Sequence, residues 1–284
     1  MLIAAGALLA AGGLWAGLIG STERIPPGWS WKSRFVGTMT YADQTGQLPQ
    51  RDTLGIYDRE ITVQSENERP RAVVLKDDYL IRDPLTGQVT WRYTIYPKVD
   101  PATGRHLNPE AADDVLVFPR NVERRTYRFR MNYVEGVPLT YVKDDVIDGV
   151  DVYLFGYKGR GEYTESYSGT AEYPGVPVEA GQEIKCADDQ FIFMIWVEPL
   201  TGEALKLAER CDSGDYVFNA STGRPVSAVA RWAGESGGRD VLQRAEWVRD
   251  ERLRLLAAEY APFAFGLCGI GLAGAGFARR RKSA

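Results

Sequence analysis

The chain has 284 residues and a formal net charge of −4, and four of its cations stand together at Arg279–Lys282. The rest of the chain is therefore distinctly acidic, which excludes the basic footprint of nucleic-acid binding and argues against a polybasic contact with anionic lipid. The length allows one large domain or two small ones between the chain ends, and an aromatic content of 11% favours a β-rich body.

The N-terminal stretch is apolar and predicts a membrane helix over residues 1–20. Residues 2–20 contain no charged side chain. The run is longer than the 7–15-residue core of a signal peptide, and no Lys or Arg precedes it. We therefore favour an uncleaved span, with a cleaved signal peptide as the alternative.

The C-terminal stretch predicts a second membrane helix over residues 260–278. This segment carries no charge and is long enough to cross about 30 Å of hydrocarbon. The basic tail that follows, residues 279–284, marks the cytoplasmic side. Two spans then put both termini in the cytoplasm and the intervening body outside the plasma membrane.

Small residues recur at a spacing of four in both predicted spans. Gly13 and Gly17 share one helix face in the first, and Gly269 and Ala273 share one in the second. Such faces allow close helix packing with each other or with a membrane-protein partner, although a general Gly/Ala-rich composition explains them equally well. Neither span contains an ionisable side chain, so we expect no ion conductance from the protein.

Residues 21–238 predict an extracytoplasmic body of antiparallel β-strands, in one lobe or two. Alternating runs rich in Val, Ile, Tyr, Phe and Thr are typical of strands. The clearest are 72–81, 89–96, 126–133, 150–157, 190–198, 215–219 and 225–232, and shorter ones are 36–41, 56–63, 140–143 and 161–173. Trp29 and Trp31 fit either an interfacial aromatic belt or the first strand.

A turn motif recurs between these runs, with a Pro near its start and a Gly at its end. It occupies residues 83–87, 100–104 and 198–202, and a variant without Pro occupies 219–223. Pro presets the first turn residue and Gly accepts a left-handed backbone, so each motif predicts a hairpin. Calcium binding by the acidic residues is the less favoured interpretation, because alternating ligands are missing.

Two of the three cysteines, Cys186 and Cys211, lie in the body and predict a disulfide outside the cytoplasm. A hairpin centred on the turn at 198–202 places Cys211 opposite Gln190, and a bend at 187–189 brings Cys186 to bridging distance. Two unpaired buried thiols are the alternative. Cys268 lies in the second predicted span.

After Gly237 and Gly238 the pattern changes to helix formers, and residues 239–259 predict a membrane-proximal helix. We expect this helix to continue into the second span, with Pro262 at the join.

No catalytic, cofactor-binding or metal-ligating motif stands out. The one histidine, His106, follows a turn and is expected in an exposed loop, and no phosphate-binding or dinucleotide-binding glycine motif is present. The acidic cluster around Asp148 has oxygen ligands but lacks the spacing of a calcium loop. The sequence therefore predicts neither an enzyme nor a cofactor.

Three ordered motifs resemble the bacterial PorA-like envelope family. Residues 118–127 (FPRNVERRTY) resemble its FPxxxEKKTY stretch, 148–155 (DGVDVYLF) its DGxxxYxF strand, and 196–202 (WVEPLTG) its WVEPxTG turn. The resemblance covers most of residues 90–278, with Arg124 and Arg125 in place of the lysines. It implies one span at each end and an outside domain whose function is largely unknown.

These observations favour a non-enzymatic envelope protein with an interaction, scaffold or accessory-subunit role. The alternative is a module that binds or transfers a lipid-like or other apolar ligand. An apolar pocket of several hundred Å³ inside the body would favour the alternative, whereas a filled core with an exposed apolar patch would favour the first.

Overall fold

The computed structural model describes residues 23–282 except 43–44, 49, 51, 70, 83, 88, 108–113, 131–135, 160–161, 164–180 and 187–190. The side chains of 89–93, 162–163, 183–186 and 261–282 are likewise not described. The chain divides into a body, Glu23–Glu246, and a second unit made of Met1–Thr22 and Trp247–Ala284. The first predicted span thus lies outside the described residues.

The body is built from one 13-stranded sheet. Its strands are β1 Ser30–Tyr41, β2 Leu54–Ser65, β3 Val73–Arg82, β4 Val89–Ile95, β5 Lys98–Val99, β6 Tyr127–Phe129, β7 Val137–Ile147, β8 Val150–Gly159, β9 Glu162–Tyr163, β10 Gln182–Cys186, β11 Phe191–Val197, β12 Ala204–Asn219 and β13 Arg224–Ser236. The prediction of a mainly β body with antiparallel strands is confirmed, and its described strands form one sheet rather than two lobes.

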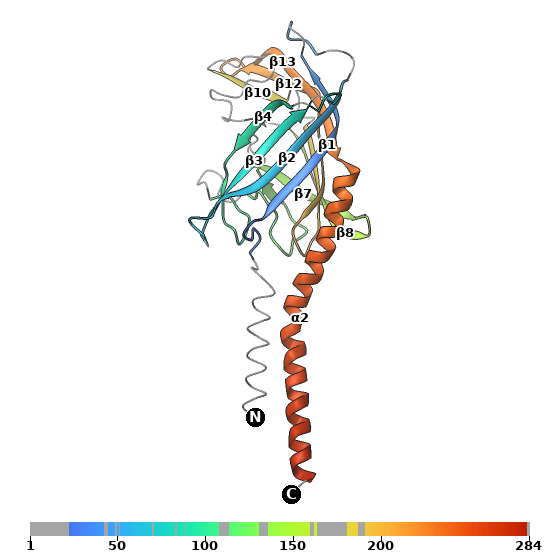
Figure 1. Ribbon diagram of the computed structural model, residues 1–284. Helices are drawn as coiled ribbons and strands as arrows, with labels where there is room; N and C mark the ends of the chain where they lie inside the picture. Colours follow the sequence, from blue (N-terminus) through green and yellow to red (C-terminus); the bar gives the residue numbers. More distant parts are fainter. Residues whose placement is uncertain are drawn as a thin grey trace. The chain divides into compact units, whose positions relative to one another are not determined.

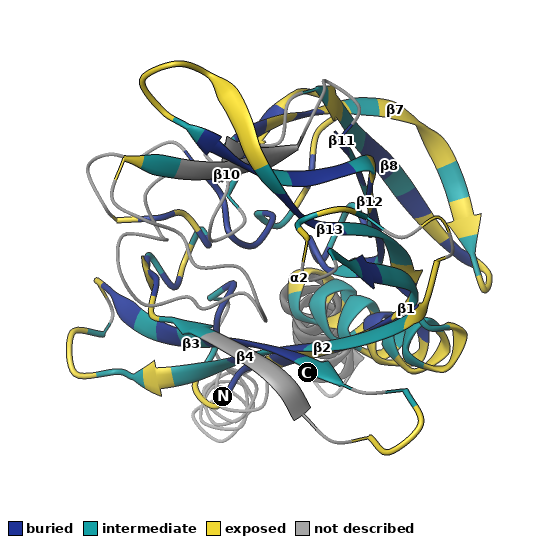
Figure 2. Ribbon diagram, turned by 90° about the horizontal axis from the view of Figure 1, so that it is seen from above, coloured by how far each residue is buried: buried dark blue, intermediate teal, exposed yellow. Residues whose placement is uncertain are grey.

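The strand order is β4-β3-β2-β1-β13-β12-β11-β8-β7-β6, with β10 and β5 added beside β12 and β3 (Figure 1). The first and last long strands are therefore neighbours, and Phe35 on β1 faces Ser236 on β13. Bridges from Val99 to His106, from Arg105 to Val115 and from Val115 to Phe129 link β5 towards β6. The sheet consequently curves around a common interior (Figure 2).

Alternation along the strands explains where the core lies. On β11 every second residue is buried, from Phe191 through Phe193 and Ile195 to Val197. Their side chains join a cluster with Phe35, Leu75, Leu139, Phe155 and Leu207 from other strands. Trp29 and Trp31 are 8% and 7% exposed and belong to this cluster, so the strand interpretation of these two residues is supported.

The recurrent turn motif folds as predicted. Gly104, Gly202 and Gly223 have φ angles of 74°, 73° and 63°, and each N–H donates to the carbonyl four residues earlier at 2.8–2.9 Å. The acidic side chains serve their own turns, since Asp100 Oδ1 accepts from Ala102 N and Glu198 Oε2 accepts from Thr201 N. This use of the carboxylates supports the turn interpretation.

Three strand segments were missed by the period-two pattern. β12 begins at Ala204 rather than at the predicted Asp215, and β10 and the two-residue β5 were not predicted. Residues 204–210 read ALKLAER, which is rich in helix formers. Pairing of Met194 with Ala208 and of Ala208 with Glu235 holds this segment in the sheet from both sides, so tertiary contacts override its local propensity.

The helix α2, Gly238–Lys282, has a continuous helical backbone through Pro262. Its first turn is fixed to β1, because Gly237 N donates to Arg34 O and Asp240 Oδ2 accepts from Arg34 N. Ala245 and Val248 on this helix are fully buried. Among the described side chains, no helix contains a stretch long and apolar enough to cross a bilayer.

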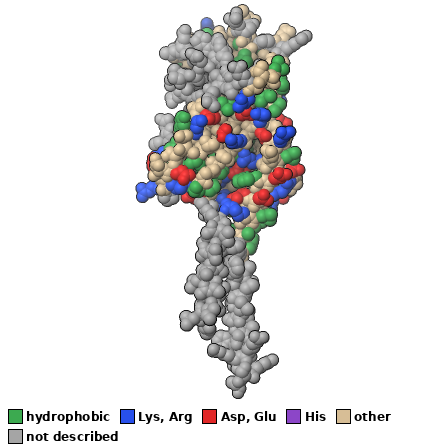
Figure 3. Space-filling model, in the orientation of Figure 1, with side chains coloured by type: hydrophobic (Ala, Val, Ile, Leu, Met, Phe, Trp, Pro, Cys, Tyr) green, Lys and Arg blue, Asp and Glu red, His purple; other side chains and the backbone are tan. Residues whose placement is uncertain are grey.

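The surface of the body carries both signs of charge. Figure 3 shows Lys and Arg side chains intermixed with Asp and Glu over the described part of that face. Exposed ion pairs such as Lys32–Glu60 and Arg124–Asp144 contribute to this mixture. No single-sign field is visible there that would attract a polyanion.

Candidate functional site

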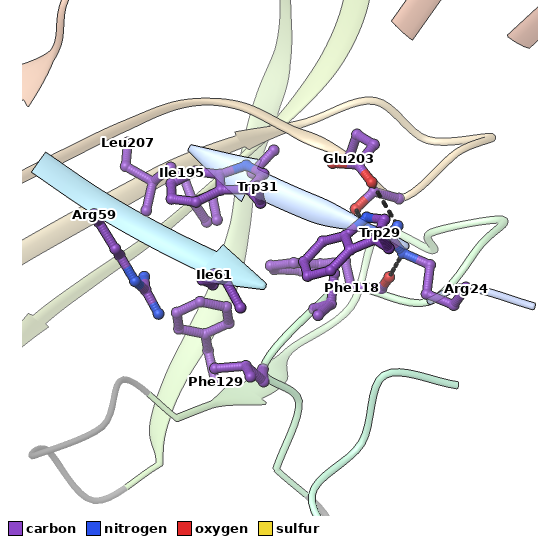
Figure 4. Close-up of a pocket in the computed structure, with 14 residues that line it drawn as sticks. Arg24, Trp29, Trp31, Arg59, Ile61, Phe118, Phe129, Ile195, Glu203 and Leu207 are labelled. Atoms are coloured by element: carbon purple, nitrogen blue, oxygen red, sulfur yellow. Dashed lines mark hydrogen bonds and ion pairs between the residues drawn. The ribbon is translucent and has the colours of Figure 1, made fainter. Parts of the chain in front are cut away.

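The interior holds a small cavity at one end of the body (Figure 4). Its walls are mostly aromatic and aliphatic side chains, including Trp29, Trp31, Ile61, Phe118, Phe129 and Ile195. The free space is about 30 Å³, which holds one or two water molecules. Ligand pockets usually measure about 300–1,000 Å³, so this cavity is a packing void and not a lipid site.

The polar end of the cavity is closed by Arg24 and Glu203, which are 3% and 1% exposed. Arg24 Nη1 donates to Glu203 Oε1 at 2.5 Å. Its Nε donates to Phe118 O at 2.6 Å, and its Nη2 donates to Gly202 O at 2.9 Å. A guanidinium presents its donors in a fixed fork, so the Arg24 side chain joins its own segment to Phe118 and to the segment of Gly202 and Glu203. This arrangement unites two family-like motifs, 118–127 and 196–202.

The same two motifs also bond through their backbones. Asn121 N donates to Leu200 O at 3.1 Å, and Val122 N donates to Pro199 O at 2.7 Å. Gly202 approaches so closely that a Cβ there would lie 2.2 Å from Pro119 O. The motifs therefore interlock as one structural unit, which gives their residues a packing role.

A second buried pair lines the opposite wall of the cavity. Arg59 donates to Asp77 through Nε at 3.1 Å and Nη2 at 2.8 Å, and these residues are 3% and 0% exposed. The Arg59 guanidinium also lies 5.7 Å from the Trp31 ring centre and 5.0 Å from that of Tyr79. Its charge is thus compensated within the protein by a carboxylate and two aromatic faces.

A second hollow is a groove on the outer face of strands β1, β11, β12 and β13. It measures about 310 Å³ and is lined by Val36, Gly37, Ile192, Met194, Ala208, Glu209, Arg210, Ala233, Gly234 and Glu235. Its floor is apolar, and Arg210 and Glu235 carry opposite charges at its margin. We call this set of residues the outer groove.

Gly37 allows β1 and β13 to approach each other closely at the outer groove. A Cβ at Gly37 would lie 1.9 Å from Ala233 O and 2.6 Å from the Cα of Gly234. The two strands approach here because neither position carries a side chain. A substitution at Gly37 would consequently alter the floor of the groove through the backbone.

Behind the groove lies a buried carboxyl group, Glu209, which faces Phe193 on β11 and Gly234 on β13 in the sheet register. Burial and, to a smaller extent, the nearby Asp215 carboxylate together raise the pKa of Glu209 to about 8. Asp215 Oδ2 accepts a hydrogen bond from Trp232 Nε1 at 2.9 Å. Glu209 is therefore mainly protonated at neutral pH.

The expectation for His106 was wrong. Its side chain is 6% exposed, because its backbone bridges to Val99 and its N–H donates to Asp114 O at 3.0 Å. Burial lowers the pKa of His106 to about 4, with the Arg130 cation acting in the same direction and Asp114 opposing it. The imidazole is neutral at pH 7.

The predicted cysteine site is described only in part. Cys211 is fully buried on β12 and is disulfide-bonded. The backbone of Cys186 pairs with Asp215, but the Cys186 side chain lies outside the described ones. Five residues of β12, from Cys211 to Asp215, span the same length as three of β13, from Trp232 to Ala230. This bulge shortens the distance along β12 from Cys211 to Asp215, the backbone partner of Cys186, and the pairing of Cys186 with Cys211 stays a prediction.

The predicted helix-packing residues also lie outside what is described. Gly13 and Gly17 are in the undescribed N-terminal segment, and Gly269 and Ala273 are in the part of α2 for which only the backbone is described. Within the described residues, no group of three or more His, Cys, Asp or Glu side chains could hold a metal ion.

Sequence reasoning missed the residues that organise the site. Arg24 and Glu203 are 179 positions apart, and neither belongs to a local pattern that predicts a buried pair. One available signal was Gly202 at the end of the recurrent turn, which directly precedes Glu203 and accepts a hydrogen bond from Arg24. The groove had no sequence signal, since its apolar residues come from four strands.

A comparison with protein families gives one match that spans nearly the whole chain. The model of the family described as Porin PorA matches residues 1–278. No curated protein matches the chain.

Proposed function

The chain belongs to the Porin PorA family, and we propose that it is a non-enzymatic integral membrane protein of the cell envelope. In this proposal the β body acts outside the cytoplasm as an interaction, scaffold or accessory-subunit module. The family match supports a membrane or envelope location. The observation that carries the interaction role is the outer groove, an open apolar hollow of about 310 Å³ beside a well-filled core.

The outer groove fits one or two apolar side chains of a partner protein. Val36, Ile192 and Met194 offer an apolar floor, whereas Arg210 and Glu235 at the margin can pair with groups of either sign. Anchor side chains in an apolar pocket with a polar rim are typical of protein interfaces. We therefore favour a protein partner over a lipid headgroup, which would call for a single-sign rim.

Photocrosslinking from the groove tests this role. A photoreactive residue at position 192, installed in the full-length protein in its native membrane, should give a defined crosslinked partner. The variant Met194→Lys should reduce the yield about tenfold, which corresponds to about 1.4 kcal/mol of binding. The matched control Val146→Lys, at a position 59% exposed on β7, should leave it unchanged. Equal yields in both variants would rule out the groove as the interface.

Binding of a lipid-like ligand is the second candidate, because the groove rather than the interior has the required volume. Mass spectrometry of the native protein distinguishes the two roles. A lipid that co-purifies stoichiometrically and is lost in Met194→Lys would support the second role, and a retained protein partner would support the first.

The proposed topology has spans at residues 1–20 and 260–278, both termini in the cytoplasm and the body outside. Its support is the apolar composition of these stretches and the cationic residues Arg279–Lys282. A reporter that is active only in the cytoplasm, fused after Ala284, should be active. A silent but expressed reporter would reverse the orientation.

Gly13, Gly17, Gly269 and Ala273 are proposed to pack membrane helices closely and not to line a pore. The family name raises the opposite role, and planar-bilayer recordings of the purified protein separate the two. We expect no channel activity. Reproducible single-channel steps that disappear in the double variant Gly13→Leu, Gly17→Leu would instead support an oligomeric helical channel.

The disulfide between Cys186 and Cys211 is part of the proposal, since an extracytoplasmic body lies in an oxidising compartment. Non-reducing peptide mapping should recover the two cysteines in one linked fragment. Recovery of Cys211 linked to Cys268, or to a second chain, would refute this pairing.

A further inference from the structure

The segment before β1 and the start of α2 each place an arginine beside the same carboxylate, that of Glu203. Arg24 lies just before β1 and Arg244 lies in the second turn of α2. Their guanidinium groups reach the two different oxygens of Glu203, Arg24 at Oε1 over 2.5 Å and Arg244 at Oε2 over 3.9 Å. The Glu203 side chain is 1% exposed, so water does not screen these charges.

The Arg244 side chain has further contacts with the entering segment. Its Nη2 donates to Lys32 O at 2.9 Å, and its guanidinium lies 5.3 Å from the ring centre of Trp31. Arg34 N, on the same strand, donates to Asp240 Oδ2 of the helix. The first turns of α2 and the first residues of β1 are thus joined at several points around Glu203.

The two oxygens of Glu203 differ in how well they are satisfied. Oε1 accepts a hydrogen bond from Arg24, whereas Oε2 is buried and accepts none. The Arg244 cation is the group that compensates Oε2. Removing it leaves a buried carboxylate oxygen with neither a hydrogen bond nor its neighbouring cation, which is costly.

We propose that Glu203 couples the entering segment, residues 23–31, to the leaving segment, residues 238–246. Opening either segment removes a cation from the Glu203 carboxylate and thereby weakens the contacts that hold the other segment. A change imposed on α2 would then be transmitted to the segment before β1 without any rearrangement of the sheet. This inference concerns the connection between the chain ends and the body, and it does not depend on what binds the outer groove.

Hydrogen exchange of the full-length protein in detergent micelles tests the coupling. The variant Arg244→Leu keeps apolar bulk against Trp31 but removes the cation. It should speed exchange in residues 23–31 about tenfold, an opening free energy lower by about 1.4 kcal/mol. The reciprocal variant Arg24→Leu should speed exchange in residues 238–246. Exchange in β8, residues 150–159, should rise less than exchange in the coupled segment in both variants.

The matched control is Arg254→Leu, because Arg254 lies on the same helix and pairs with Glu251. It should leave residues 23–31 unchanged. Where an arginine variant fails to fold, Glu203→Gln preserves the shape of the side chain and should loosen both segments together. Unchanged exchange at 23–31 in Arg244→Leu, or an equal increase in β8, would overturn the proposal.

Discussion

Two buried carboxyl groups near the start of β12 are accommodated in opposite ways. Glu203 is held by the cations Arg24 and Arg244 and belongs to the junction of the two interlocked motifs. Glu209 pairs with Phe193 and Gly234 in the register, and burial together with the nearby Asp215 carboxylate raises its pKa to about 8. Burial is thus compensated by ion pairing at Glu203 and by protonation at Glu209.

The comparison separates a part of the body that is held by ion pairs from a part whose stability depends on pH. The junction depends on ion pairs between Glu203 and two guanidinium groups. The Glu209 region instead changes charge near pH 8. A structural role follows for Glu203, and a pH-dependent contribution to stability follows for Glu209.

The largest expected effect comes from breaking the junction with Arg24→Leu. Removing one member of a buried ion pair should lower the free energy of unfolding by about 3–5 kcal/mol, as measured by urea denaturation. The control Lys32→Leu breaks a pair whose side chains are 66% and 37% exposed, and it should change stability by less than about 1 kcal/mol. Similar losses in both variants would contradict the special role of the junction.

A smaller effect should follow from crowding the junction through Gly202→Ala. The residue has a left-handed backbone, and the added Cβ would lie 2.2 Å from Pro119 O, so the expected loss is about 2–4 kcal/mol. Gly223 has a similar φ angle with nothing within 4 Å of its Cβ position. Gly223→Ala should therefore cost only about 1 kcal/mol, and equal losses would mean that backbone strain alone matters.

The sequence predicted much of the local structure correctly because the signals were local. Alternating residues located β3, β8 and β11, and the Pro–Gly motif located the turns that follow β3 and β11. Even the register was nearly right. The predicted pairing of Cys211 with Gln190 would place Arg210 opposite Phe191, and Arg210 instead pairs with the next residue, Ile192. A β-bulge between Trp196 and Val197 accounts for this difference of one residue.

The junction and the buried polar groups could not be predicted in this way. Arg24 meets Glu203 across 179 positions, and His106 is buried by bridges to Val99 and by its bond to Asp114. Such contacts arise when the sheet curves and brings non-local segments together. A single sequence gives the propensity of each segment but does not specify which segments meet.

The third prediction uses pH to separate the two carboxyl groups. An acid whose pKa is raised from 4.5 to about 8 in the folded state binds more protons when folded than when unfolded across that window. Its contribution is fully favourable below about pH 4.5 and is lost as pH rises through about 8. The wild-type protein should lose stability over this range, and Glu209→Gln, which cannot ionise, should remove that part of the loss.

Urea denaturation at pH 5 and at pH 8 measures the effect. Glu209→Gln should gain about 3.5 kcal/mol relative to wild type between the two pH values, because each unit of pKa shift is worth about 1.4 kcal/mol and most of the shift takes effect within this range. The control Glu235→Gln, on the neighbouring strand with its side chain 58% exposed, should show no such gain. An unchanged pH dependence in Glu209→Gln would mean that Glu209 is compensated by charge as Glu203 is, and the contrast between the two sites would fail.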